Sequence, residues 1–108
     1  MEKRKPHYEL HKLQELFRSV KTRVITQTAQ KGAATMGYMD EDDIRNVISR
    51  LCSEHFYKSM TAYQDNKIWQ DVYRYLDDDK ALYIKLQLSV DGKKAVLIQM
   101  KRDEGSGE

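Results

Sequence analysis

The chain has 108 residues, of which 40% are hydrophobic and 33% are charged, and its formal net charge is +2. This length fits one ordinary domain, and the hydrophobic fraction is too high for a disordered protein. The longest aliphatic run, residues 95–98, is far too short for a membrane-spanning helix. The single cysteine, Cys52, excludes an internal disulfide bond and the multi-cysteine zinc sites.

The two ends of the chain differ in charge. The basic first residues lead into no apolar segment, so we expect no secretory signal and a cytoplasmic location. Residues 102–108 combine one arginine with three carboxylates, two glycines and a serine. We therefore expect a single domain over residues 1–101, followed by a disordered acidic tail over residues 102–108.

The first half of the chain predicts helices. After Pro6, which suits the first turn of a helix, apolar residues recur at three- and four-residue spacing through Val20 and indicate an amphipathic helix of about three turns. Residues 22–26 are β-branched and favour a brief extended piece, whereas residues 28–36 are alanine-rich and favour a second helix. Asp40 is typical of an N-cap, and a buried helical stripe follows it: Ile44, Val47, Ile48 and Leu51.

The second half of the chain predicts strands. Aromatic and β-branched residues dominate four segments separated by polar turns: residues 56–63, 68–76, 82–90 and 95–101. Helices followed by strands with short turns indicate an α+β domain, in which N-terminal helices pack on a mostly antiparallel β-sheet.

The apolar faces of the last two predicted strands must coincide, because a slip of one residue would turn every side chain over. A plain two-residue turn at Asp91–Gly92 would place Leu88 opposite Ala95, and at the far end of the hairpin it would then place an apolar side chain opposite a charged one. One extra residue in the turn instead pairs Leu88 with Val96, Leu86 with Ile98 and Ile84 with Met100. This register also places Tyr83 opposite Lys101 and Lys85 opposite Gln99, on the face away from the aliphatic core.

Tyrosines and basic residues alternate through the predicted strands. Five of the seven tyrosines lie there, interleaved with cations such as Lys58, Arg74, Lys85 and Lys101. Aromatic rings and cations together are typical of surfaces that bind single-stranded nucleic acid. Strands also favour tyrosine for packing alone, so composition leaves an RNA-binding face and an ordinary sheet as alternatives.

Other candidate sites are weaker. His7 and His11 have a metal-ligand spacing but no evident third ligand, so surface histidines are the better interpretation. The acidic run Asp40–Asp43 reads as a helix cap, because consecutive helical residues point in different directions. Cys52 and His55 do not form a convincing nucleophile pair.

The stretch FYKSMTAYQDNKIWQDVYR, residues 56–74, resembles the MqsR family, the toxins of type II toxin–antitoxin pairs. The opening residues 1–7, the strand around Tyr83 and the closing strand ending in Lys101 are also similar to that family. The resemblance implies a RelE-like fold and a sequence-specific mRNA interferase that acts without the ribosome, a metal or another cofactor and prefers GCN sites, especially GCU. It further implies a zinc-containing, DNA-binding MqsA-type antitoxin as partner of a toxin that alone is monomeric.

The residues that match the family's catalytic set are Lys58, Gln70, Tyr83 and Lys101, and we expect Arg74, Tyr57 and Lys85 to contact RNA. In a metal-free endoribonuclease the ribose 2′-OH displaces the 5′-oxygen and leaves a 2′,3′-cyclic phosphate. The lysines and Arg74 would then stabilise the phosphorane charge, Tyr83 would donate or accept a proton, and Gln70 would position the reacting groups. Two alternatives stay open: a non-catalytic RNA-binding or regulatory module, and a decayed toxin that retains only antitoxin binding.

Overall fold

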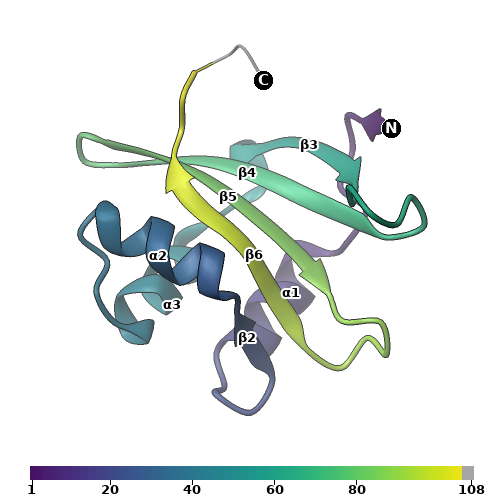
Figure 1. The fold of residues 1–108 in the computed structure, drawn as a ribbon, viewed down its shortest axis with the longest axis horizontal. Coiled ribbons are helices and arrows are strands. Elements are labelled where there is room, and N and C mark those ends of the chain that lie inside the picture. Colours follow the sequence, from purple (N-terminus) through teal and green to yellow (C-terminus); the bar gives the residue numbers. More distant parts are fainter. Residues whose placement is uncertain (106–108) are drawn as a thin grey trace.

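The computed structural model describes residues 1–105, which form three α-helices, a short 3-10 helix and six strands (Figure 1). In chain order these elements are β1 (Glu2–Lys3), α1 (Leu10–Phe17), β2 (Arg23–Ile25), α2 (Gln27–Thr35), α3 (Glu41–Arg50), η1 (Ser53–His55), β3 (Phe56–Thr61), β4 (Trp69–Asp77), β5 (Lys80–Leu88) and β6 (Ala95–Arg102). The predicted α+β class is thus confirmed. In this part of the chain, no helix has the length and apolar character needed to cross a membrane.

The six strands form one twisted sheet in the order β1-β3-β4-β5-β6-β2. Neighbouring strands are antiparallel, except that β2 runs parallel to β6. The sheet is therefore mostly antiparallel, as predicted. The long central strands β4, β5 and β6 carry most of its area, whereas β1 and β2 are short edge strands, which suits the exposed margins of a sheet.

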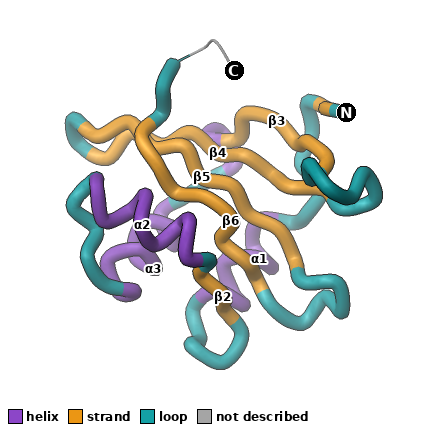
Figure 2. The backbone as a smooth tube through the Cα atoms, in the orientation of Figure 1, coloured by secondary structure: helices purple, strands orange, loops and turns teal. Residues whose placement is uncertain are grey.

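The helices leave one face of the sheet uncovered. Helices α1 and α3 lie behind the sheet in the view of Figure 1, and α2 lies along the β6 edge; Figure 2 shows the same layers by element type. Leu13 of α1 and Ile48 of α3 pack with Tyr73, Ile84 and Leu97 of the sheet, and each of the five is at most 1% exposed. This single core fixes the sheet against the helices, and the opposite face remains available for polar side chains.

Local sequence signals explain how the helices begin. The Asp40 carboxylate accepts a hydrogen bond from the Asp43 backbone N–H at 2.9 Å, so the predicted N-cap is confirmed. Thr26 caps α2 in the same way through the Ala29 N–H. The first helix is shorter than predicted: it ends at Phe17, and Val20 lies in the following turn with 69% of its surface exposed.

The register of β5 and β6 is partly as predicted. Tyr83 pairs with Lys101, Ile84 with Met100 and Lys85 with Gln99, but Leu88 pairs with Ala95 rather than Val96. The extra residue is absorbed by a bulge inside β6 at Ile98, not by the turn. The turn itself is closed by the hydrogen bond from the Ser89 N–H to the Lys94 carbonyl, which sets the plain register next to it.

The bulge changes which β6 side chains face the core. Ala95, Leu97 and Met100 are fully buried, whereas Val96 and Ile98 are only half-buried. The expectation that Val96 and Ile98 share the core face with Met100 is therefore wrong. Because the bulge lies between Leu97 and Met100, both phases of the alternation deliver an apolar side chain to the core.

The C-terminal boundary lies later than expected. Arg102 is the last residue of β6, and the Asp103 backbone N–H donates to the Ala81 carbonyl at 2.8 Å. The first two residues of the expected disordered tail therefore continue the sheet. Residues 106–108 lie outside the described part of the chain.

Candidate active site

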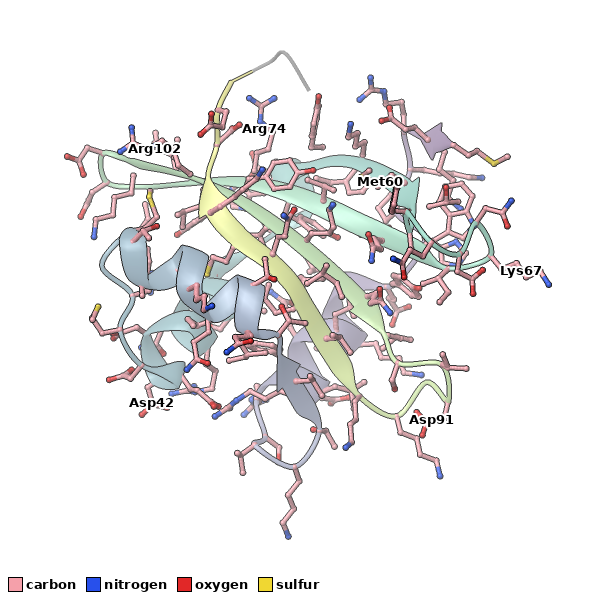
Figure 3. The ribbon with its side chains drawn as sticks, viewed as in Figure 1. Asp42, Met60, Lys67, Arg74, Asp91 and Arg102 are labelled. Atoms are coloured by element: carbon pink, nitrogen blue, oxygen red, sulfur yellow. The ribbon has the colours of Figure 1, made fainter. Side chains whose placement is uncertain are left out.

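The residues singled out from the sequence lie on the face of the sheet opposite α1 and α3. Strand alternation turns the core residues Ile84 and Tyr73 toward the helices and their neighbours the other way. We call the latter side the site face; it carries Lys58, Gln70, Arg74, Tyr83, Lys85 and Lys101, with Tyr57 beside them. Figure 3 shows Arg74 and Met60 on strands away from α2 and α3.

One row across three strands brings together Arg74, Tyr83 and Lys101. Arg74 pairs with Tyr83, and Tyr83 pairs with Lys101. The Lys101 ammonium lies 5.1 Å from the Tyr83 ring centroid, and the Lys85 ammonium lies 5.8 Å from it on the next row. Tyr83 is 3% exposed, so this phenol lies beside two cations in a nearly buried position.

Arg74 is held from two sides. Its guanidinium carbon lies 4.7 Å from the Tyr57 ring centroid, and its Nε donates to Asp103 Oδ2 at 2.6 Å. A guanidinium presents several N–H groups in a rigid fork. With its guanidinium over the Tyr57 ring and Nε anchored by Asp103, Arg74 is held in one place on the site face.

Lys58 is buried beside an acidic residue of the N-terminal strand. Its side chain is 5% exposed, and its ammonium donates to Glu2 Oε2 at 2.7 Å. The register of β1 against β3 places Glu2 opposite Met60, which brings its side chain to the site face. This hydrogen bond lowers the pKa of Glu2 below its ordinary value, which favours the charged carboxylate beside Lys58.

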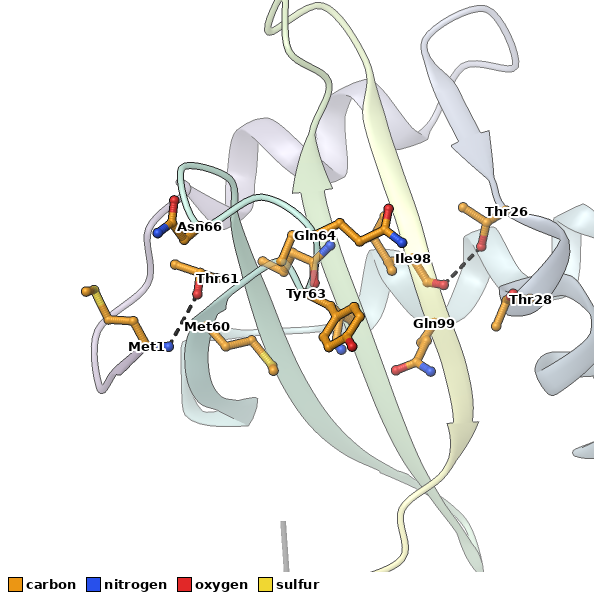
Figure 4. Close-up of a pocket in the computed structure, with 13 residues that line it drawn as sticks. Met1, Thr26, Thr28, Met60, Thr61, Tyr63, Gln64, Asn66, Ile98 and Gln99 are labelled. Atoms are coloured by element: carbon orange, nitrogen blue, oxygen red, sulfur yellow. Dashed lines mark hydrogen bonds between the residues drawn. The ribbon is translucent and has the colours of Figure 1, made fainter.

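Gln70 lies at the other end of the cluster. Its Nε2 donates to Gln87 Oε1 at 2.8 Å, and the side chain borders a groove of about 970 Å³ that opens beside the site face (Figure 4). Lys85 and Gln99 also line this groove. Cationic and amide side chains are therefore neighbours on one surface.

The weaker candidates lie elsewhere. His7 stacks on Trp69 with ring centroids 5.5 Å apart, and the Asp40–Asp43 run caps α3. His55 Nδ1 accepts a hydrogen bond from the Cys52 backbone N–H, so this pair closes a turn. Over residues 1–105 no three histidine, cysteine or acidic side chains gather closely enough to hold a metal ion.

Several site-face residues escaped the sequence reasoning. Glu2 and Asp103 each form an ion pair with a predicted site cation, and Gln87 bonds Gln70. Glu2 lies in the opening segment already noted as similar to a toxin family, and only that similarity could have pointed to Glu2 as a site residue. Asp103 had none, because it falls in a stretch with tail-like composition.

The arrangement suits an RNA phosphate. Lys58, Arg74, Lys85 and Lys101 supply positive charge, of which the carboxylates of Glu2 and Asp103 offset a part, and Tyr83 supplies an ionisable hydroxyl on the same face. No histidine occurs between Phe56 and Lys101, so proton transfer on these strands must use other groups. The chemistry that fits is phosphate binding with a phenol nearby.

Comparison with known proteins places these residues in a family. The profile of the family described as "Motility quorum-sensing regulator, toxin of MqsA" matches residues 5–102. The chain is also 41% identical, over 91 residues, to the protein named mRNA interferase toxin MqsR from Escherichia coli (strain K12); the match covers 84% of this chain and 91% of that protein. The family profile spans every element from α1 to β6, and thus both the helical layer and nearly all of the site face. The chain belongs to the MqsR toxin family.

Proposed function

We propose that this chain is a toxin that inhibits translation by cleaving mRNA, and that the site face is its active site. The observation that carries the proposal is the row Arg74–Tyr83–Lys101, with buried Lys58 close by on the same face. Rows two residues apart along a strand are separated by about 7 Å, which is within the span of one nucleotide unit. The relative's name, mRNA interferase toxin, supports the same activity.

In the proposed reaction the ribose 2′-oxygen attacks the adjacent phosphorus and the bond from phosphorus to the 5′-oxygen breaks. The 2′-OH loses a proton, the leaving 5′-oxygen gains one, and the products carry a 2′,3′-cyclic phosphate and a 5′-OH. Lys58, Arg74 and Lys101 stabilise the negative charge on the phosphorane, and the Tyr83 hydroxyl exchanges one of the two protons. Gln70 positions the reacting groups through its amide.

The test is cleavage of a 5′-labelled mRNA by the purified protein in EDTA, without ribosomes. We expect discrete cuts at GCN sites, GCU above all, with cyclic-phosphate and 5′-OH ends. Tyr83→Phe should lower the rate by ~10²-fold, the usual size of an acid–base contribution, with little change in melting temperature. Lys101→Ala should cost about 10²–10³ in rate at every site, because phosphate contacts carry no sequence information.

Lys93→Ala is the matched control, since Lys93 is an exposed lysine in the β5–β6 turn. Cleavage that needs added metal or ribosomes would contradict the proposed mechanism. Binding of RNA without strand breaks would leave a regulatory module, and complex formation with an antitoxin without cleavage would leave a decayed toxin.

We further propose an MqsA-type antitoxin, containing zinc and binding DNA, as the partner that sequesters a cytoplasmic, monomeric toxin. The family description, toxin of MqsA, supports this partner. Co-expression of the two proteins should restore growth that the toxin alone arrests. Light scattering should give a monomer mass for the toxin, and metal analysis of the complex should find zinc in the antitoxin.

A further inference from the structure

The groove beside the site face has a composition unlike that of the cationic cluster. Four side-chain amides and three threonine hydroxyls line it, and its charged groups are the Lys85 side chain and the N-terminal ammonium of Met1, which donates to the Thr61 hydroxyl at its margin. The amides of Gln64 and Gln99 make no hydrogen bond within residues 1–105, although both border the groove. A surface of neutral donors and acceptors is suited to the edges of nucleobases rather than to phosphates.

An aromatic ring projects at the rim of this groove. Tyr63 lies in the β3–β4 loop, is 100% exposed, and extends over the sheet toward the side of Gln99 (Figure 4). A tyrosine with no packing role offers its ring to a partner, and single-stranded nucleic acids stack their bases on such rings. The exposure of this large side chain is thus explained if a base covers it.

The groove is continuous with the proposed active site. Gln70 and Lys85 belong to both, and Lys85 pairs across the sheet with Gln99. A strand of RNA whose scissile phosphate lies at Lys58 and Lys101 would extend its neighbouring nucleotide into the groove.

We propose that this groove is a base-recognition site of the enzyme: Tyr63 stacks on a base next to the scissile phosphate, and the amides of Gln99 and Gln64 read its edge. The proposal rests on the proposed function and adds the residues that select the cleavage site. Bidentate amide–base contacts and stacking act independently of the phosphate contacts, so specificity and rate are separable here.

The experiment compares variants on a pool of RNAs randomised around one cut site, with sequencing of the products and with kcat and KM on one RNA. Tyr63→Ala should raise KM by roughly 5- to 100-fold, as expected from the loss of one stacked base, and Tyr63→Phe should restore it. Gln99→Met should change the base preference at one position of the cleavage motif. Met39→Ala, at another exposed side chain remote from the groove, is the control.

Unchanged KM and an unchanged motif in Tyr63→Ala and Gln99→Met would overturn the groove proposal while leaving the cleavage activity standing. Weaker antitoxin binding with unaltered RNA cleavage would assign the groove to the protein partner and also overturn it. If the wild type cuts no RNA, the proposed function fails. Binding of an RNA with a 2′-deoxy residue at the cut position then tests the groove, which stands only if Tyr63→Ala weakens that binding.

Discussion

Replacing Asp71 should reveal how the N-terminal segment is attached beneath the site. This β4 carboxylate is completely buried and accepts hydrogen bonds from three donors. They are the backbone N–H groups of His7 and Tyr8 at 2.9–3.1 Å and the Ser59 hydroxyl at 2.6 Å. One side chain thus joins β3, β4 and the segment that leads back to β1 and Glu2.

Asp71→Ala removes the acceptor and leaves the backbone N–H groups of His7 and Tyr8 with no side-chain partner, whereas the Ser59 hydroxyl keeps a longer hydrogen bond to the Gln70 carbonyl at 3.4 Å. Each buried donor without a partner costs about 1–3 kcal/mol. Because His7 is exposed and Tyr8 is only half-buried, water reaches both N–H groups and the lower part of this range applies, so the free energy of unfolding should fall by about 3 kcal/mol. Asp71→Asn keeps one acceptor oxygen and the Ser59 hydroxyl can rotate, so only charge-assisted strength is lost, about 2 kcal/mol in all.

Urea denaturation followed by circular dichroism measures both values. A loss of about 3 kcal/mol is a large share of the roughly 5–15 kcal/mol that holds a domain together. Asp79→Ala, at an exposed aspartate in the β4–β5 turn, is the matched control. If Asp71→Ala costs within 1 kcal/mol of that control, the buried-donor reasoning is refuted.

Three further perturbations test other contacts. In Gly32→Ala the new methyl group would overlap the Met100 carbonyl oxygen. The free energy of unfolding measured by chemical denaturation should therefore fall by about 1–3 kcal/mol, despite the better helix propensity of alanine. A rise in that free energy would refute this contact. Lys58 lowers the pKa of Glu2, so the stability that this carboxylate contributes is present above its ordinary pKa of 4.5 and fades as pH falls below it. Glu2→Gln should therefore lose less stability at acidic pH than the wild type. An equal decline of the two melting temperatures across that pH range would contradict this. Partial burial lowers the pKa of His7, so as pH falls the unfolded state binds a proton before the folded state does. The melting temperature should therefore decline as pH falls below 6.5, and His7→Asn should remove this decline.

Side-chain alternation explains why much of the fold could be predicted from the sequence. In β5 the leucines and Ile84 alternate cleanly with Tyr83 and Lys85, so both faces follow from the pattern. The Asp40 cap was equally readable, because aspartate before an amphipathic stripe has a local cause. In β6, by contrast, apolar residues occupy both phases, and a bulge at Ile98 satisfies the core better than a longer turn. The pattern alone does not choose between these solutions.

The hydrophobic pattern alone brings site residues together only where they share one strand pair; Lys58, Gln70 and Arg74 were predicted from the resemblance to a family instead. The Tyr83–Lys101 pair follows from the register of β5 and β6. Glu2 could not be placed, because a two-residue strand has no periodicity and its partner Lys58 lies 56 positions away. Asp103 was assigned to a tail by composition, yet it forms an ion pair with Arg74 because β6 continues to Arg102, the residue before it.

The position of β6 in the sheet also has a consequence for the order of events during synthesis. This strand follows all the others in the sequence but lies between β5 and β2, and it carries Lys101. While the ribosome is still adding residues 95–102, β2 has no neighbour to pair with and the Tyr83 row lacks its ammonium. Domains fold as their segments emerge, so the sheet closes and the site is completed in the same late step. The proposed active site is therefore incomplete for as long as β6 is being translated.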